Sequence, residues 1–148
     1  MMRTAALCAA VCLLTAGWAV AGEKGTPQEA MALLDKAVKA IETDGEAKAL
    51  AAFNDPKGGY QNGDLYVFCS GPDKKTTANI DPSMIGVDQS AIKDVDGKAV
   101  GMEIQAAAAK GGGTVEYKWK NPASGKIETK VSFVKKAGNQ ICGVGAYK

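Results

Sequence analysis

Residues 113–147 read GTVEYKWKNPASGKIETKVSFVKKAGNQICGVGAY, and this stretch decides the fold. Val115, Tyr117 and Trp119 alternate with charged residues, which is the period-2 pattern of a strand with one buried face. Two further apolar runs follow, each after turn-forming Asn, Pro, Ser or Gly residues. The three runs span residues 113–120, 126–136 and 141–147. Because short connections join antiparallel neighbours, the stretch predicts a three-stranded meander whose faces the rest of the chain must cover.

A long helix is predicted before this meander. Thr26 and Glu29 form a capping box, and Pro27 occupies the first helical position, where no N–H is needed. An apolar stripe at 3.6-residue spacing follows at Met31, Leu34, Val38 and Ile41. Since the apolar content continues past Gly45, we expect roughly 25 helical residues that bend or break at this glycine. The stripe is expected to cover one sheet face, and a homodimer formed through this helix is the alternative use.

Two more strands and a covering segment lie between the helix and the meander. The sequence DLYVFC at residues 64–69 predicts a strand, and residues 76–80 predict a second strand paired with it in a hairpin. Isolated apolar residues then stand between turn formers, as in a compact segment of short helical turns. A further helix is expected to begin near Asp96 and to end at Lys110, before three glycines. This order predicts an α+β domain built on one five-stranded antiparallel sheet.

The N-terminus has the features of a secretory signal peptide. Arg3 is its only charge, residues 5–20 are apolar or small, and an A-x-A site follows at residues 19–21. The apolar run is short for a membrane span, and an uncleaved anchor is the alternative. We therefore expect residues 1–21 to be a signal peptide and residues 22–148 to be one exported domain, periplasmic or secreted.

The charge balance and the residue types exclude several classes of function. The chain has 18 Lys and Arg against 16 Asp and Glu, without a basic block, so nucleic acid is not an expected partner. It contains no histidine, which excludes Ser–His and Cys–His nucleophile pairs and the HExxH zinc site. The DVDG sequence at residues 94–97 lacks the spacing of a calcium loop and predicts a turn. We expect no enzyme activity, no metal and no cofactor, and acid–base catalysis by carboxylates is the remaining enzymatic alternative.

Several motifs occur in an order that resembles a known family. They are FNDPKGGY at residues 53–60, DPSMIGVD at 81–88, IKDVDGK at 92–98, GGGTVEYKWKNP at 111–122, KVSFVK at 130–135 and GVGAY at 143–147. Together they resemble the single Cache domain of the second type, an extracytoplasmic, PAS-like sensor domain. The resemblance extends from the first helix to Tyr147. No signalling module follows, so a free-standing version of the domain is expected.

The resemblance implies both an architecture and a function. The long N-terminal helix is expected behind the sheet, and a ligand pocket is expected on the other face, beneath residues 81–112. The implied ligand is a small molecule, often a short carboxylate such as acetate, propionate, pyruvate or lactate, and the implied partner is a membrane receptor or kinase. We expect an exported sensor-type domain that binds a small solute without turnover. The alternative is a structural or protein-interaction module with a vestigial pocket.

The resemblance also implies ligand-binding residues. Tyr117 and Trp119 match the family's Y-x-W, and Tyr147 matches its closing tyrosine. Lys130 matches the lysine of its K-x-S-Y-V, and Ser132 lies on the same strand face. A lysine suits a small acid that is removed from water, because an unpaired carboxylate is costly to bury. The alternatives are core aromatics at the first two positions and a solvated strand face at Lys130.

Two cysteines, Cys69 and Cys142, remain after the predicted signal peptide. In PAS-like sheets their strands are neighbours, so the resemblance implies a disulfide between them, which an oxidising compartment would preserve. Such a bond would close a loop of about 70 residues. Buried free thiols and a metal site are the alternatives, although two cysteines without histidine make a poor metal shell.

Overall fold

The computed structural model describes residues 24–148, and the signal peptide predicted at residues 1–21 lies outside this part of the chain. The elements in order are α1 (Pro27–Asp44), α2 (Glu46–Asn54), β1 (Gln61–Asn62), β2 (Leu65–Ser70), β3 (Thr76–Ala78), the 3-10 turns η1 (Pro82–Met84) and η2 (Gln89–Ala91), α3 (Val100–Ala109), β4 (Gly113–Lys120), β5 (Ile127–Ala137) and β6 (Gln140–Tyr147). Within these residues, no helix combines the length and the apolar character needed to cross a bilayer.

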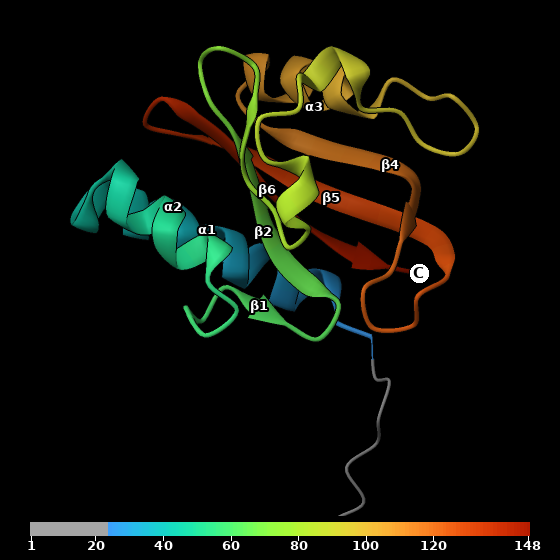
Figure 1. Ribbon diagram of the computed structural model, residues 1–148, viewed down its shortest axis with the longest axis horizontal. Helices are drawn as coiled ribbons and strands as arrows, with labels where there is room; N and C mark the ends of the chain where they lie inside the picture. Colours follow the sequence, from blue (N-terminus) through green and yellow to red (C-terminus); the bar gives the residue numbers. More distant parts are fainter. Residues whose placement is uncertain (1–23) are drawn as a thin grey trace, which may run out of the picture.

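The strands form one antiparallel sheet in the order β1-β2-β6-β5-β4 (Figure 1). All five predicted strands are present, and the two-residue strand β1 is a sixth. β1 pairs with the first half of β2, and β3 pairs with the second half of the same strand. The last strand of the chain therefore lies in the middle of the sheet, between β2 and β5.

The N-terminal helix begins and ends as its sequence predicts. The backbone N–H of Glu29 donates to Thr26 Oγ1 (3.2 Å), and the backbone N–H of Thr26 donates to Glu29 Oε2 (2.8 Å), so both halves of the capping box are present. α1 ends at Gly45, whose φ of 87° lies in the left-handed region that glycine tolerates, and α2 resumes at the next residue. The predicted break at Gly45 is confirmed.

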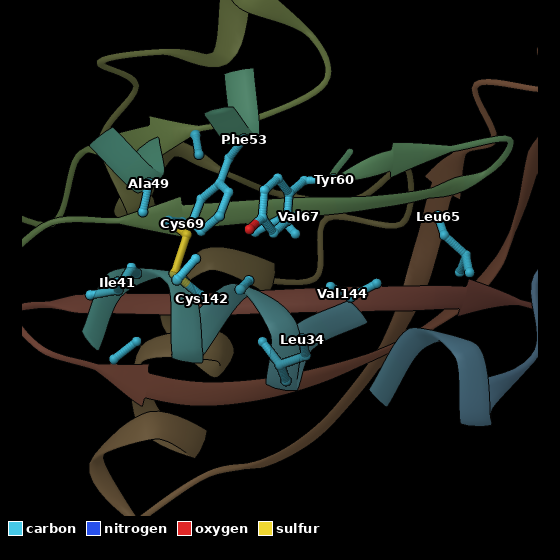
Figure 2. Close-up of a cluster of buried hydrophobic side chains, with 14 of the residues drawn as sticks. Leu34, Ile41, Ala49, Phe53, Tyr60, Leu65, Val67, Cys69, Cys142 and Val144 are labelled. Atoms are coloured by element: carbon cyan, nitrogen blue, oxygen red, sulfur yellow. A yellow bond between two sulfur atoms is a disulfide. The ribbon is translucent and has the colours of Figure 1, made fainter. Parts of the chain in front are cut away.

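The larger core lies between α1, α2 and one face of the sheet (Figure 2). Leu34 and Ile41 of α1 point toward Val67 of β2 and Val144 of β6, so this part of the predicted apolar stripe covers the sheet. Met31, predicted in the same stripe, is instead 41% exposed, because alanines of α1 complete the face that packs on the sheet. Phe53 of α2 adds an edge-to-face contact with a tyrosine of the following loop. This face of the domain is closed by apolar packing, which leaves the opposite face for a site.

The opposite face carries α3 and the two 3-10 turns. α3 begins at Val100, a few residues after the predicted start near Asp96, because the side chain of Asp94 accepts hydrogen bonds from the backbone N–H groups of Asp96 (2.9 Å) and Lys98 (3.0 Å) and holds a turn there. A Cβ at Gly101 would collide with the backbone carbonyl of Gln89, so glycine permits α3 to pack directly on η2. The covering segment is therefore one packed unit over the sheet.

Candidate functional site

The polar face of β5 is buried, and the face expected to be apolar is partly exposed. Lys130 and Ser132 have 0% of their surface exposed, whereas Ile127 is 50% exposed. In the strand register, Lys130 lies opposite Tyr117 of β4 and opposite Tyr147 of β6. The interpretation of Lys130 as part of a solvated strand face is therefore wrong. The register brings three of the predicted site residues together on one sheet face.

Two glycines of β6 make room for these side chains. A Cβ at Gly145 would collide with the side chains of Lys130 and Ser132, and a Cβ at Gly143 would collide with the ring of Phe68. Because alternate residues of a strand point to the same face, the spacing of two places both glycines beneath the site. The two glycines of β6 thus leave space above the sheet, and the lysine side chain lies in this space.

The ammonium group of Lys130 lies in a cage of aromatic rings. Nζ is 4.0 Å from the ring centroid of Tyr66, 5.1 Å from that of Tyr147 and 5.6 Å from that of Phe68. Ring faces attract a cation without supplying the acceptor that an ammonium N–H normally has. Within residues 24–148, this Nζ is the one buried side-chain nitrogen or oxygen that lacks a hydrogen-bond partner.

The charge of this lysine is poorly stabilised. Burial lowers the pKa of Lys130 to about 7, and the carboxylate of Asp64 opposes the shift. Asp64 is itself buried and is occupied elsewhere: it accepts hydrogen bonds from the backbone N–H of Gly25 (2.9 Å) and from Asn121 Nδ2 (3.3 Å). The buried amine of Lys130 therefore loses its proton far more readily than an ordinary lysine.

The hydroxyl groups around the lysine have partners of their own. Tyr117 Oη and Ser132 Oγ share a hydrogen bond of 2.8 Å, and Tyr147 Oη donates to the backbone carbonyl of Lys120 at 2.9 Å. Burial raises the pKa of each of Tyr66, Tyr117 and Tyr147 above its ordinary value. These tyrosines are therefore neutral at physiological pH and cannot neutralise the lysine.

A small cavity lies between this sheet face and the covering segment. Its volume is about 30 Å³, space for little more than one or two water molecules. It is lined by aromatic residues (Tyr66, Phe68, Tyr117 and Trp119), by polar residues (Ser70, Thr76, Asn79 and Gln89) and by apolar residues of the cover (Met84, Ile92, Val100 and Ile104). Of the predicted ligand-binding residues, Tyr117 and Trp119 line the cavity, whereas Lys130, Ser132 and Tyr147 do not.

Tyr66 separates this cavity from Lys130. Its ring lines the cavity and also contacts the Nζ of Lys130. A surface hollow of about 390 Å³ shares Tyr66, Asn79, Met84 and Trp119 with the cavity, so these residues lie at the boundary between the cavity and the hollow. Lys130 has none of its surface exposed, and the ring of Tyr66 is the nearest of the three rings around its Nζ.

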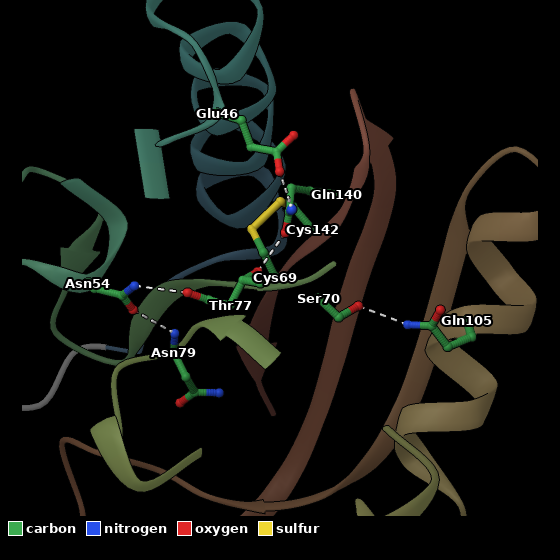
Figure 3. Close-up of a disulfide and its surroundings, with 9 residues drawn as sticks. All are labelled: Glu46, Asn54, Cys69, Ser70, Thr77, Asn79, Gln105, Gln140 and Cys142. Carbon is green, nitrogen blue, oxygen red and sulfur yellow. Dashed lines mark hydrogen bonds between the residues drawn. A yellow bond between two sulfur atoms is a disulfide. The ribbon is translucent and has the colours of Figure 1, made fainter. Parts of the chain in front are cut away.

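The predicted disulfide is present. Cys69 of β2 and Cys142 of β6 are opposite each other in the strand register, 73 residues apart in sequence, and their sulfur atoms are joined (Figure 3). Both residues are buried on the α1 side of the sheet. The interpretations as free thiols and as metal ligands are therefore wrong. The bond ties β2, which carries two rings of the lysine cage, to the centre of the sheet.

Hydrogen bonds around the disulfide hold β2 and β3 to their surroundings (Figure 3). Gln105 Nε2 of α3 donates to Ser70 Oγ of β2 at 2.8 Å, and Asn54 Nδ2 donates to the backbone carbonyl of Thr77 at 2.9 Å. β2 is thus connected to the covering helix α3 as well as to the sheet.

Sequence reasoning missed several residues of the site. Tyr66 and Phe68 were part of a continuous apolar run, and only their alternation with buried Leu65 and Val67 could have placed them on the pocket face. The G-x-G spacing in GVGAY was a second available signal, because strand glycines mark a close approach. The role of Asp64 had no local signal, since its partners are distant in sequence.

Three solved structures share the fold. A methyl-accepting chemotaxis protein from Vibrio parahaemolyticus superposes with a TM-score of 0.70 at 23% identity, over 81% of this chain and 86% of that one. A periplasmic sensor domain of a chemotaxis protein gives a TM-score of 0.62 at 23% identity, over 81% and 88%. A third structure, described as showing the structural basis for carboxylic acid recognition by a Cache chemosensory domain, gives a TM-score of 0.59 at 25% identity. The match covers 81% of this chain and 86% of that one.

Sequence comparisons identify the family. A stretch of 58 residues is 40% identical to the sensor histidine kinase MctS of Rhizobium johnstonii, and it spans 38% of this chain but only 13% of the kinase. Residues 24–147 match the family described as single Cache domain 2. Because this match includes nearly all of the described residues, the chain belongs to the single Cache domain 2 family.

Proposed function

We propose that this protein is an extracytoplasmic sensor domain that binds a short carboxylate without turnover, with Lys130 as the anchor of the ligand. The observation that carries the proposal is the ammonium group of Lys130, which is fully buried and has no hydrogen-bond acceptor. A cation buried without a partner is costly, and groups of this kind cluster at functional sites. A carboxylate would supply the missing acceptor and the missing charge.

The lining of the cavity favours a short alkyl chain. Apolar side chains such as Val100 and Ile104 form the wall opposite the aromatic floor. The cavity of the unliganded protein has space for only one or two water molecules, so even an acid of a few carbon atoms requires the covering side chains to move. In our proposal the ligand enters from the surface hollow and displaces the ring of Tyr66 from the ammonium of Lys130. The hydroxyl groups of Tyr117 and Ser132, which share one hydrogen bond, leave one further O–H donor beside the anchor.

The relatives agree with this proposal. One structural neighbour, at 25% identity, is described as a carboxylic acid-recognising Cache chemosensory domain, and others come from chemotaxis proteins. Single Cache domains sense small molecules outside the cytoplasm. We therefore propose export through the predicted signal peptide at residues 1–21 and a membrane receptor or kinase as the signalling partner.

A thermal-shift experiment tests the carboxylate anchor. We expect acetate, propionate, pyruvate or lactate, at about one hundred times its dissociation constant, to stabilise the protein by about 2.7 kcal/mol, a shift of several degrees in Tm. Lys130→Met keeps most of the side-chain volume and removes the charge, so it should abolish the shift. Lys126→Met, in the exposed turn before β5, is the matched control and should leave the shift unchanged. A shift that survives in Lys130→Met would contradict the assigned anchor.

The alternative function is a protein-interaction module with a vestigial pocket. The small volume of the cavity and the shielding of Lys130 by Tyr66 favour it. On this account none of the acids changes Tm, and the protein dimerises through α1 in a concentration-dependent manner. Sedimentation velocity over a range of protein concentrations, with and without acid, distinguishes the two functions.

A further inference from the structure

The groups that face Lys130 leave its charge uncompensated. Tyr66 of β2, Tyr117 of β4 and Tyr147 of β6 surround it, and burial raises the pKa of all three, so they stay neutral. The carboxylate of Asp64, just before β2, is the charged group that acts on Lys130, and it forms no hydrogen bond with Nζ.

The remaining carboxylate near this end of β5 is also occupied. Glu128 accepts a hydrogen bond from Asn121 Nδ2 at 2.7 Å and lies 3.5 Å from the Nζ of Lys24. Its interactions hold the pKa of Glu128 below its ordinary value, so it is ionised but turned toward other partners. Without a ligand, therefore, no group of the described chain forms an ion pair with Lys130, and burial favours the neutral amine.

We infer that the acid enters this site together with a proton, so that carboxylate binding is coupled to protonation of Lys130. The inference rests on the proposed function, since it needs a carboxylate beside Nζ. The step is balanced: a carboxylate, a proton from solvent and the neutral amine become an ammonium–carboxylate pair. The anion and the proton are co-ligands of one buried position, and each raises the affinity of the site for the other.

The coupling predicts a specific pH dependence of affinity. Burial lowers the pKa of free Lys130 to about 7, so below this pH the amine is already protonated and affinity is constant. Above this pH, the affinity for the acid falls about tenfold with each pH unit. The Kd should therefore be about tenfold higher at pH 8 and about a hundredfold higher at pH 9 than at pH 6.

Calorimetry tests the coupling, with propionate as the ligand or with whichever of the four acids shifts Tm most. Titrations in two buffers with different ionisation enthalpies give the number of protons taken up per ligand, expected to be about 0.9 at pH 8 and about 0.1 at pH 6. Lys130→Arg keeps a permanent charge and should bind with no proton uptake at either pH. Binding without proton uptake at pH 8 would overturn the inference and leave the carboxylate site intact. Failure of every acid to bind at any pH would overturn both.

A measurement on the unliganded protein tests the protonation of Lys130 without any ligand, so it remains informative if a variant fails to bind for other reasons. The folded pKa of Lys130, about 7, lies below its ordinary value of 10.5, so between these values the unfolded chain binds more protons than the folded one. Stability should therefore rise with pH above 7, by up to about tenfold in the folding equilibrium constant per unit, relative to Lys130→Met. Urea unfolding from pH 6 to pH 9 measures this difference. Parallel curves for the two proteins would show that Lys130 stays charged, and the inference would fail.

Discussion

Gly145 is the residue on which the position of Lys130 depends. Its missing Cβ leaves the space that the lysine side chain and Ser132 Oγ occupy. Gly145→Ala should therefore destabilise the protein by about 1–3 kcal/mol through overpacking, measured by urea unfolding. In the double variant with Lys130→Ala, part of this cost should disappear, because the clashing lysine atoms are gone while Ser132 Oγ remains.

Gly113→Ala is the control for this substitution. Gly113 is also a strand glycine, and a Cβ there would meet Ala107 at 3.7 Å, an ordinary van der Waals distance. Its replacement should change stability little. If Gly145→Ala cost no more than Gly113→Ala, the close packing of Lys130 against β6 would be contradicted.

At the residue scale, the sequence predicted which residues share a strand face better than it predicted which of the two faces is buried. The alternation in IETKVSF placed Lys130 and Ser132 on one face of β5, which the structure confirms. It could not show that this polar face is the buried one, because that depends on the covering segment and on Gly145, which are distant in sequence. Tyr66 was missed for the same reason: its role comes from a contact between β2 and β5 across β6.

At the element scale, β2 is the strand that connects the site to the rest of the molecule. It carries Tyr66 and Phe68 toward the site and Cys69 toward the α1 core, where the disulfide joins it to β6. The bond constrains a loop of the unfolded chain, so its loss should cost about 4 kcal/mol. Urea unfolding of the oxidised protein and of the variant with both Cys69→Ala and Cys142→Ala measures the difference.

Reduction supplies the comparison for this prediction. A reducing agent should lower the stability of the wild-type protein and leave the double alanine variant unaffected. An oxidised protein no more stable than the alanine variant would contradict the structural role of the bond.

Most elements followed from local patterns. The capping box at Thr26 and the glycine at position 45 set both ends of α1, and turn residues separated the last three strands as predicted. The start of α3 was misplaced because Asp94 holds a turn through its side chain. The strand β1 was missed because a two-residue strand is too short to show the alternation of apolar and polar residues, and its pairing with β2 depends on the fold.

At the scale of the whole molecule, the two faces of the sheet differ in structure: one packs in the apolar core and the other borders the cavity. α1 and α2 close one face with an extended apolar core, and α3 with the 3-10 turns covers the other face over a cavity. The cavity and the adjoining hollow lie on the side of the sheet that α3 and the 3-10 turns cover, so we expect ligand-dependent movement there. Family membership is shown by the match over residues 24–147, while the ligand depends on a few side chains that the fold alone does not determine.

The structure of the protein with bound acid tests the central claim most directly. Crystals grown with propionate, or with the acid that shifts Tm most, should show its carboxylate within hydrogen-bonding distance of the Nζ of Lys130. The ring of Tyr66 should have moved away from that atom. A carboxylate bound to the polar side of the cavity, at Ser70 or Thr76, with Tyr66 still on the lysine, would contradict the account.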